Sequence, residues 1–251
     1  MIIKHHILLL ALGICNLGGI VAFSQGAASN GGLRSFAYVL ASHGVTDLSE
    51  ESLISALTHS DPEVRSAAAM KLAEDHHDDA APAVESALSR EQNLNAQIAL
   101  AEGLWGLHDG KGIAHLHAMC TNSSLKFTTL ISVIDALGIT HSPSGVCAET
   151  FFAAMGRSKE PGEIAAGTTR LSVIFRDATP EQARRILTTL QLLLADTKQE
   201  ADIRLEASQA LANIGTPECA EAIRAAISEE QNPDIRVFFE ATLKGLQKSP
   251  H

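Results

Sequence analysis

The sequence is poor in the residue types on which nucleic-acid binding depends. Its 251 residues include only eight Phe, one Tyr and one Trp, too few to form a platform on which successive bases stack. The 19 Lys and Arg are outnumbered by 29 Asp and Glu, and the resulting net charge of −10 repels a phosphate backbone. We therefore expect no nucleic-acid partner, while a hydrophobic content of 45% excludes a disordered chain.

Motifs of the common enzyme classes are missing as well. The sequence contains no nucleophile elbow, no HExxH and no CxxC. Residues 106–112 (GLHDGKG) are only superficially similar to a phosphate loop, because no Ser or Thr follows Lys111 and no predicted strand precedes the segment. We predict a protein that is not an enzyme, with no catalytic residues and no cofactor.

Cysteine is scarce, and no two cysteines have the spacing of a metal or redox motif. Cys15 lies in the N-terminal segment, which leaves Cys120, Cys147 and Cys219, an odd number that cannot pair completely. We interpret these three as small buried hydrophobic residues. A Cys120–Cys147 disulfide is the alternative.

Histidine is plentiful, and two clusters have to be weighed as metal sites. Residues 76–79 (HHDD) lie at an expected junction of two helices, where histidine suits the C-terminus of one helix and Asp79 caps the next. His115 and His117 stand near Cys120, but residues two apart on a helix point about 200° away from each other, which disfavours a shared ion. We predict no metal site and keep a metal-binding envelope protein as an alternative function.

Residues 1–24 have the organisation of a signal peptide. A short basic start precedes the apolar run Ile7–Phe23, and the small residues Ala22 and Ser24 stand before a cleavage point at Gln25. We expect an exported protein, periplasmic or secreted. The run is also just long enough to span a bilayer, so an uncleaved membrane anchor is the alternative, and only then do we expect membrane contact.

One spacing of apolar residues recurs six times along the chain. Large aliphatic residues stand eight positions after each of six anchor residues, and mostly apolar residues stand four and eleven positions after them. These offsets share one face of an α-helix, so each unit contains a helix that buries one stripe. The anchors are Val64, Ala96, Lys126, Glu163, Ile203 and Ile235.

The starts of these helices are marked too. Pro62, Pro161 and Pro233 suit the first helical position, where the missing N–H is not needed. Three residues before each anchor stands a good N-cap or an acidic residue, either of which stabilises the N-terminal end. These residues are Asp61, Asn93, Ser123, Glu160, Glu200 and Asn232.

A shorter helix precedes each of the six, and no segment alternates apolar and polar residues as a β-sheet requires. Neither helix of a pair can bury its stripe alone. We therefore predict an all-α protein in which about six helical hairpins stack into an α-solenoid. Residues 25–47 are expected to form a linker and an N-terminal capping helix, residues 48–248 the repeat domain, and residues 249–251 a tail.

The second helices resemble a known family. Asp61–Ala73 (DPEVRSAAAMKLA) is similar to the second helix of a short HEAT repeat, a type also found in phycobilisome-lyase-like proteins. Residues 200–215 and 232–246 resemble the same element, and the resemblance covers about residues 48–248. It implies, as a further alternative, an accessory or lyase-like role in an enzyme complex.

The resemblance also implies a ladder of polar side chains between repeats. In HEAT repeats an arginine near the start of the second helix contributes to this ladder. Arg65, Arg204 and Arg236 correspond to that arginine. The other three units carry different residues at this position, namely Gln97, Phe127 and Ile164.

One surface is a candidate for partner binding. Positions two and nine after the anchors point away from the core, and four large apolar residues stand there: Ile98, Trp105, Leu205 and Val237. The resemblance implies that second helices line the concave side of the solenoid. We therefore predict a non-catalytic scaffold that binds a protein or peptide there, with Trp105 as anchor because Trp is enriched in binding hot spots. The alternative is that these side chains pack against neighbouring helices.

Overall fold

The computed structural model describes residues 35–248. The signal peptide expected at residues 1–24 and the tail expected at residues 249–251 lie outside this range, as does the first part of the linker. The described part of the chain contains 13 α-helices, two short 3-10 helices and no strand, so the all-α prediction is confirmed. None of these helices combines the length and the hydropathy that crossing a membrane requires.

The helices form six consecutive hairpins, as the repeat predicts, preceded by one capping helix. The capping helix is α2 (Phe36–Ser42), and the short 3-10 helices are η2 (Asp78–Ala80) and η3 (Gly145–Cys147). The hairpins are α3 (Glu50–Ala56) with α4 (Pro62–Glu74), α5 (Ala81–Arg90) with α6 (Leu94–Gly106), α7 (Lys111–Cys120) with α8 (Phe127–Ile139), α9 (Ala148–Met155) with α10 (Pro161–Phe175), α11 (Pro180–Ala195) with α12 (Ala201–Ile214), and α13 (Pro217–Glu229) with α14 (Pro233–Lys248).

Most second helices begin where the sequence predicts. The side chains of Asp61 and Asn93 accept hydrogen bonds from backbone N–H groups in the first turns of α4 and α6. Pro62 and Pro161 occupy the first turns of α4 and α10. These caps satisfy or remove donors that have no partner inside the helix, which fixes the point where each helix starts.

The start of α8 differs from the prediction. Its N-cap is Lys126, so the assignment of Ser123 as a cap is wrong. Asn122 Oδ1 accepts hydrogen bonds from the backbone N–H and the hydroxyl of Ser124, at 3.1 and 2.6 Å. This local turn occupies the residues that would otherwise form the first turn, so the helix begins later.

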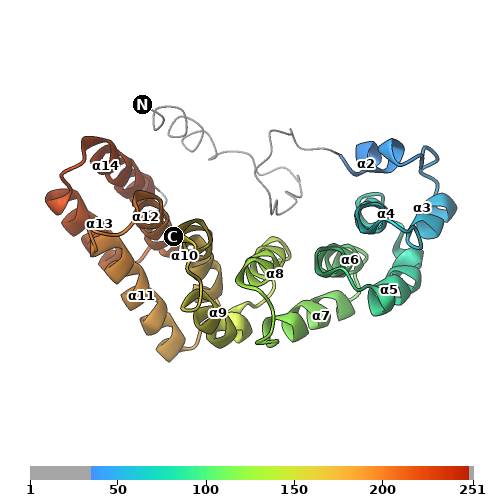
Figure 1. Ribbon diagram of the computed structural model, residues 1–251, viewed down its shortest axis with the longest axis horizontal. Coiled ribbons are helices and arrows are strands. Elements are labelled where there is room, and N and C mark those ends of the chain that lie inside the picture. Colours follow the sequence, from blue (N-terminus) through green and yellow to red (C-terminus); the bar gives the residue numbers. More distant parts are fainter. Residues whose placement is uncertain (1–34, 249–251) are drawn as a thin grey trace.

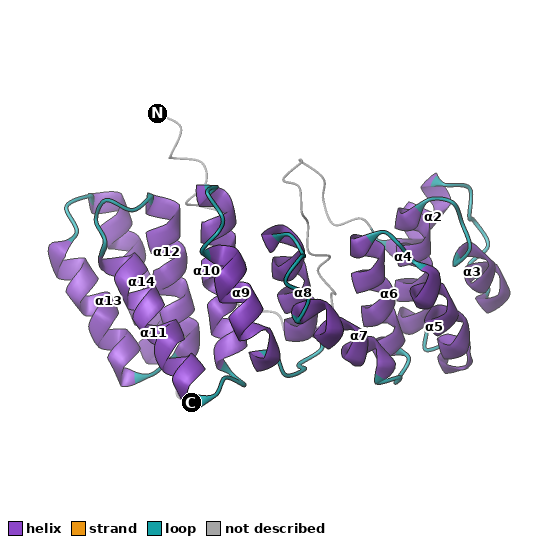
Figure 2. Cartoon of the chain, turned by 60° about the horizontal axis from the view of Figure 1, so that its bottom comes forward, coloured by secondary structure: helices purple, strands orange, loops and turns teal. Residues whose placement is uncertain are grey.

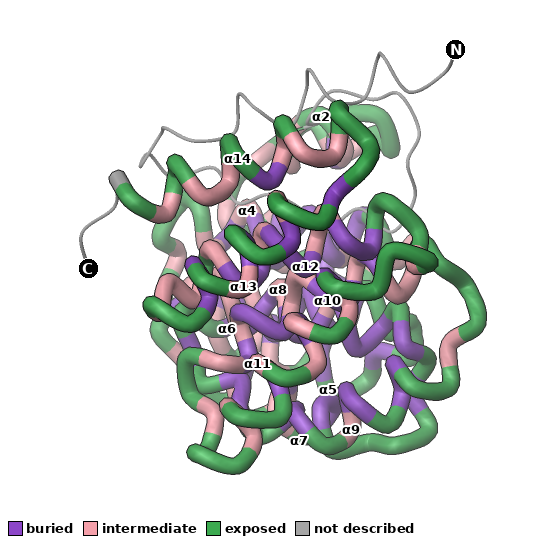
Figure 3. Tube along the Cα trace, turned by 90° about the vertical axis from the view of Figure 1, so that its left-hand side faces the viewer, coloured by how far each residue is buried: buried purple, intermediate pink, exposed green. Residues whose placement is uncertain are grey.

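The hairpins stack side by side into a curved solenoid (Figures 1 and 2). Figure 1 shows the second helices α4, α6, α8, α10 and α12 along the inner side of an arc, and the first helices α5, α7, α9 and α11 along its outer side. Buried positions lie between the two layers, whereas the outer surfaces are exposed (Figure 3). The concave side therefore consists of second helices.

The core follows the repeat. The aliphatic residues eight positions after the anchors are completely buried in five units, and in α14 the sixth, Leu243, is half-buried. That difference arises because no described helix stacks beyond the last hairpin. The five buried residues are Leu72, Leu104, Ile134, Leu171 and Leu211.

Buried ion pairs connect successive hairpins near both ends of the solenoid. In α4, Nε and Nη2 of Arg65 donate to the two carboxylate oxygens of Glu91, at 2.6 and 2.8 Å. In α12, Nη1 of Arg204 lies 2.5 Å from Oε2 of Glu230. Both glutamates directly follow a first helix, so each pair joins one second helix to the hairpin after it.

In each network, a side chain of the following second helix also binds the glutamate, by donating a hydrogen bond to its backbone carbonyl oxygen. Nε2 of Gln97 donates to the carbonyl of Glu91 at 2.7 Å, and Nε of Arg236 donates to the carbonyl of Glu230 at 3.1 Å. Gln97 therefore takes the ladder position although it is not an arginine, because an amide N–H reaches the same acceptor. We define these two networks as the Glu91 ladder and the Glu230 ladder.

The middle hairpins are joined by a disulfide instead. Cys120, the last residue of α7, is bonded to Cys147, the residue before α9. Nε2 of His117 lies 2.7 Å from the carbonyl oxygen of Pro143, so the loop after α8 folds back over α7 and brings the two sulfur atoms together. The interpretation of Cys120 and Cys147 as free buried residues is therefore wrong, whereas Cys219 is a free, buried thiol as expected.

Aromatic packing replaces the ladder in the same region. Phe127 occupies the ladder position of its unit, and its ring is buried between α8 and α10. The ring fits because Gly167 has no side chain, since a Cβ atom there would lie 2.3 Å from Cζ of Phe127. The ring of Phe151 packs beside it, with 5.1 Å between the ring centroids.

Candidate functional site

Helices α6 and α8 are neighbours on the concave side (Figure 1). Each of these helices carries a single charged residue, Glu102 in α6 and Asp135 in α8, and neither contains Lys or Arg. Leu100 and Leu104 are completely buried, and Glu102, midway between them, points to the opposite side of α6, the inner side of the arc. Two carboxylates thus lie on an otherwise apolar pair of helices.

Asp135 forms an ion pair with Arg170. Nε and Nη2 of Arg170 in α10 donate to the two oxygens of Asp135, each at 2.8 Å. A further donor of the guanidinium, Nη1, binds the carbonyl of Ala166 at 3.1 Å. This bidentate geometry holds Arg170 on Asp135 and away from other acceptors.

Glu102 has no such partner. Among residues 35–248, no hydrogen bond or ion pair reaches its half-buried carboxylate. Burial raises the pKa of Glu102 to about 7, and the negative charge of Asp135 contributes in the same direction. The concave side therefore presents a carboxylate whose charge is uncompensated.

Trp105 follows Glu102 by one helical turn, and its side chain remains 40% exposed. It is the protein's single tryptophan. The uncompensated carboxylate and the exposed indole therefore lie on neighbouring positions of α6, and we define Glu102 and Trp105 together as the α6 site.

The four residues predicted to line the concave groove do not form one surface. Trp105 is exposed, but Ile98 is only 5% exposed and belongs to the core, so its assignment to the surface is wrong. The helical wheel gives the direction of Ile98 on α6 but not how closely neighbouring helices pack around it. Leu205 is half-buried, and Val237 is 63% exposed on α14, separated from α6 by several helices (Figure 1).

Glu102 and Asp135 were not among the site residues predicted from the sequence. Their signal is that each is the lone charge of a helix that is otherwise apolar or neutral. What distinguishes the two carboxylates is the position of Arg170, which comes from a different hairpin. That contact cannot be predicted from the local pattern of any one helix.

The residues weighed as a metal site on α7 do not come together. Cys120 is consumed by the disulfide, and Nε2 of His117 is engaged by the carbonyl of Pro143. Nε2 of His115 is buried without a hydrogen-bond partner in the described part of the chain, and burial lowers the pKa of this imidazole. These environments differ too much for a shared ion.

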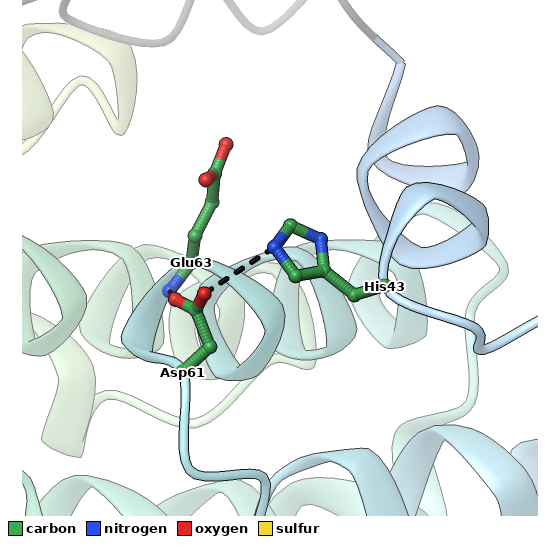
Figure 4. Close-up of side chains that lie close together, drawn as sticks. All are labelled: His43, Asp61 and Glu63. Carbon is green, nitrogen blue, oxygen red and sulfur yellow. Dashed lines mark hydrogen bonds and ion pairs between the residues drawn. The ribbon is translucent and has the colours of Figure 1, made fainter.

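A different cluster brings possible metal ligands together at the start of α4 (Figure 4). One ligand atom from each of His43, Asp61 and Glu63 lies within 4.8 Å of the others. Nε2 of His43 is 3.3 Å from Oδ2 of Asp61, while Oδ1 of Asp61 accepts the backbone N–H of Glu63. These contacts cap α4 and tie α2 to it, and the positive end of the α4 dipole already favours the carboxylates.

A groove on the other side of the solenoid lies between α11 and α13. Its volume is 520 Å³, and α13 contributes Glu218, Glu221 and Glu229 to its lining. Three glutamates thus line a groove that is separate from the α6 site.

Comparison with known proteins agrees with this architecture. The fold defines an α-solenoid of stacked helical hairpins, and the family model of HEAT repeats matches residues 50–128, the segment from α3 to the start of α8. The resemblance of this chain to HEAT repeats is thereby confirmed. No curated protein matches the sequence.

Two solved structures have a similar course of the chain. An engineered protein is 19% identical, with a TM-score of 0.42, and the match covers 79% of this chain and 96% of that one. Human deoxyhypusine hydroxylase in complex with glycerol is 13% identical, with a TM-score of 0.40, and the match covers 87% of this chain and 86% of that one.

Proposed function

We propose that this protein is a non-catalytic scaffold that binds a protein or peptide on the concave side of its solenoid. The observation that carries the proposal is the exposure of Trp105, the protein's single tryptophan, on α6 of that side. A tryptophan left 40% exposed buries a large apolar area when a partner covers it, which is why Trp dominates many binding interfaces. HEAT repeats, moreover, commonly serve as protein-interaction modules.

We also infer that the protein is exported. The basic and apolar organisation of residues 1–24 supports a signal peptide. The Cys120–Cys147 disulfide supports the same inference, because disulfides persist in oxidising compartments. Fractionation of the host cell followed by mass measurement should yield a chain that begins near Gln25, whereas a full-length chain in the membrane fraction would favour the anchor.

The scaffold proposal is tested with the natural partner. Native mass spectrometry of the protein, isolated from the envelope or secreted fraction of its host, should reveal a second polypeptide. Replacing Trp105 by Ala should then weaken the isolated complex about tenfold or more. Leu192→Ala, a change at an exposed apolar residue of α11 on the outer side of the solenoid, is the matched control and should leave the affinity nearly unchanged. Equal affinities for the two variants, with melting curves unchanged, would contradict the proposal.

The alternative of a metal-binding envelope protein depends on His43, Asp61 and Glu63. Calorimetric titration with zinc separates it from the scaffold proposal. We expect no heat above background, because His43 and Asp61 already bind each other and α4. Stoichiometric binding that disappears in His43→Ala would favour the metal function instead.

A further inference from the structure

The charge distribution on α6, α8 and α10 leaves one group unsatisfied. Of the two carboxylates on α6 and α8, Asp135 is paired with Arg170 and Glu102 is not. A half-buried carboxylate without a counter-charge is unfavourable, because burial removes water that would otherwise solvate it. Folded proteins seldom retain such a group on an apolar surface unless something else compensates it.

No cation of the described chain is placed to supply that compensation. The two helices α6 and α8 contain neither Lys nor Arg. Arg170 on the adjacent helix is held by both oxygens of Asp135 and by the carbonyl of Ala166. Among residues 35–248, the ionised Glu102 therefore has no counter-charge, and a cation of a partner would supply one.

The neighbouring Trp105 restricts the chemistry of that molecule. The face of an indole ring attracts a cation, and most strongly a guanidinium, which also stacks on the ring as a plane. A long basic side chain matches both parts of the site, since its apolar stem packs on the ring while its charged head reaches the carboxylate. A neutral apolar side chain would cover Trp105 but would leave Glu102 buried without a partner.

We propose that the α6 site binds an arginine side chain of the partner, with Glu102 as the counter-ion and Trp105 as the stacking surface. The proposal rests on the proposed function and specifies the chemistry of its partner, a basic segment. The net charge of −10 favours the approach of such a segment to the whole molecule, and the α6 site gives it a specific position.

The test uses the fluorescence of Trp105, which reports on this site alone because the protein contains no other tryptophan. The probe is an acetylated, amidated hexa-arginine peptide, titrated into the mature protein at physiological ionic strength. We expect a saturable change of the emission, and we expect Glu102→Gln to weaken binding about tenfold. Hexa-glutamine should cause no change.

Glu221→Gln in the groove between α11 and α13 is the matched control, because it removes the same charge from a different part of the molecule. It should change the affinity by less than about twofold. Equal weakening by both variants would overturn the proposal, since it would show general attraction to an acidic protein. Thermal melting of each variant establishes that it is folded.

The remaining outcomes separate this proposal from the proposed function. If hexa-arginine leaves the emission unchanged, the arginine site is overturned, while the complex isolated from the host still tests concave binding independently. If a neutral leucine–alanine peptide binds and Glu102→Gln does not weaken it, concave binding stands and the basic partner is overturned.

Discussion

Successive hairpins are joined by different contacts near the two ends of the solenoid and in its middle. Near each end, an arginine of one second helix binds a glutamate that precedes the next second helix, as in the Glu91 and Glu230 ladders. In the middle, a disulfide and the packing of Phe127 against Gly167 join the hairpins. The comparison teaches that stacking of hairpins is what the repeat specifies, whereas the connecting groups can be exchanged.

The irregular loops of the middle explain why the ladder is absent there. The ladder requires a glutamate at a fixed distance before each second helix. The turn at residues 121–126 delays the start of α8, and the loop after α8 folds back over α7. A covalent bond and an aromatic contact tolerate such a change of register better than paired hydrogen bonds do.

The largest effect is expected from breaking a ladder. Arg204 and Glu230 are almost completely buried, with side chains 5% and 6% exposed. Replacing Arg204 by Ala leaves the Glu230 carboxylate buried without its counter-charge, so the free energy of unfolding should fall by about 3–5 kcal/mol. Urea denaturation measures this, and a loss below about 1 kcal/mol would contradict the role given to the ladder.

Acid should weaken the two ladders. The hydrogen bond from Arg65 lowers the pKa of Glu91 below 4.5. Burial alone would raise the pKa of Glu230, but the hydrogen bonds from Asn232 and Arg204 outweigh it and lower this pKa as well. A lowered carboxyl pKa contributes stability above pH 4.5 that is lost as the pH falls through the folded-state value. Hydrogen exchange at about pH 3 should therefore accelerate in α4 and α12 before α8.

The second-largest effect is expected from removing the disulfide that joins the middle hairpins. Removing the disulfide through Cys147→Ala combined with Cys120→Ala should lower the free energy of unfolding by about 2–4 kcal/mol. Added reductant should destabilise the natural protein by a similar amount and leave this variant unaffected. Cys219→Ala, which changes a buried cysteine outside the disulfide, is the control and should remain sensitive to reductant.

A third, smaller effect concerns the aromatic contact of the middle. Gly167→Ala places a methyl group against the ring of Phe127 and should lower the free energy of unfolding by about 1–3 kcal/mol. Gly162, in the same helix, has no neighbouring atom within 4 Å of the point where a Cβ would stand, so Gly162→Ala should be neutral or slightly stabilising. Equal effects of the two substitutions would show that helix propensity, and not Phe127, decides the result.

The smallest effect on stability is expected at the α6 site, which belongs neither to the ladders near the ends nor to the contacts of the middle. The pKa of Glu102 is raised from 4.5 to about 7, so its charged form destabilises the folded protein. Glu102→Gln should therefore stabilise the protein by about 1–2 kcal/mol at about pH 8. The gain should decline as the pH falls from about 7 toward 4.5 and vanish below it, which denaturation at several pH values will measure. A gain that is independent of pH would contradict the assignment.

Much of the fold is predictable because the information is local. Apolar residues at helical spacing, N-caps and prolines fix all six second helices and their partners within a few residues. The turns also give three histidines a structural role, since His76, His108 and His141 adopt positive φ angles of 58°, 63° and 52° after successive second helices. Side chains at such positions are exposed and separated by whole repeats, which does not favour a shared metal ion.

The site is less predictable because its properties depend on contacts between hairpins. The helical wheel places Trp105 correctly at the surface, but it cannot show that the packing of neighbouring helices buries Ile98. The importance of Glu102 arises from a cation that is engaged elsewhere, Arg170, one hairpin beyond Asp135. The disulfide likewise depends on how a loop folds, which the separation of Cys120 and Cys147 in sequence leaves open.

Binding on the concave side is tested most directly by hydrogen exchange of the protein alone and in the complex isolated from its host. The account predicts slower exchange in α6 and α8, centred on the α6 site, with little change in α11 and α13. Protection confined to the groove between α11 and α13 would contradict it.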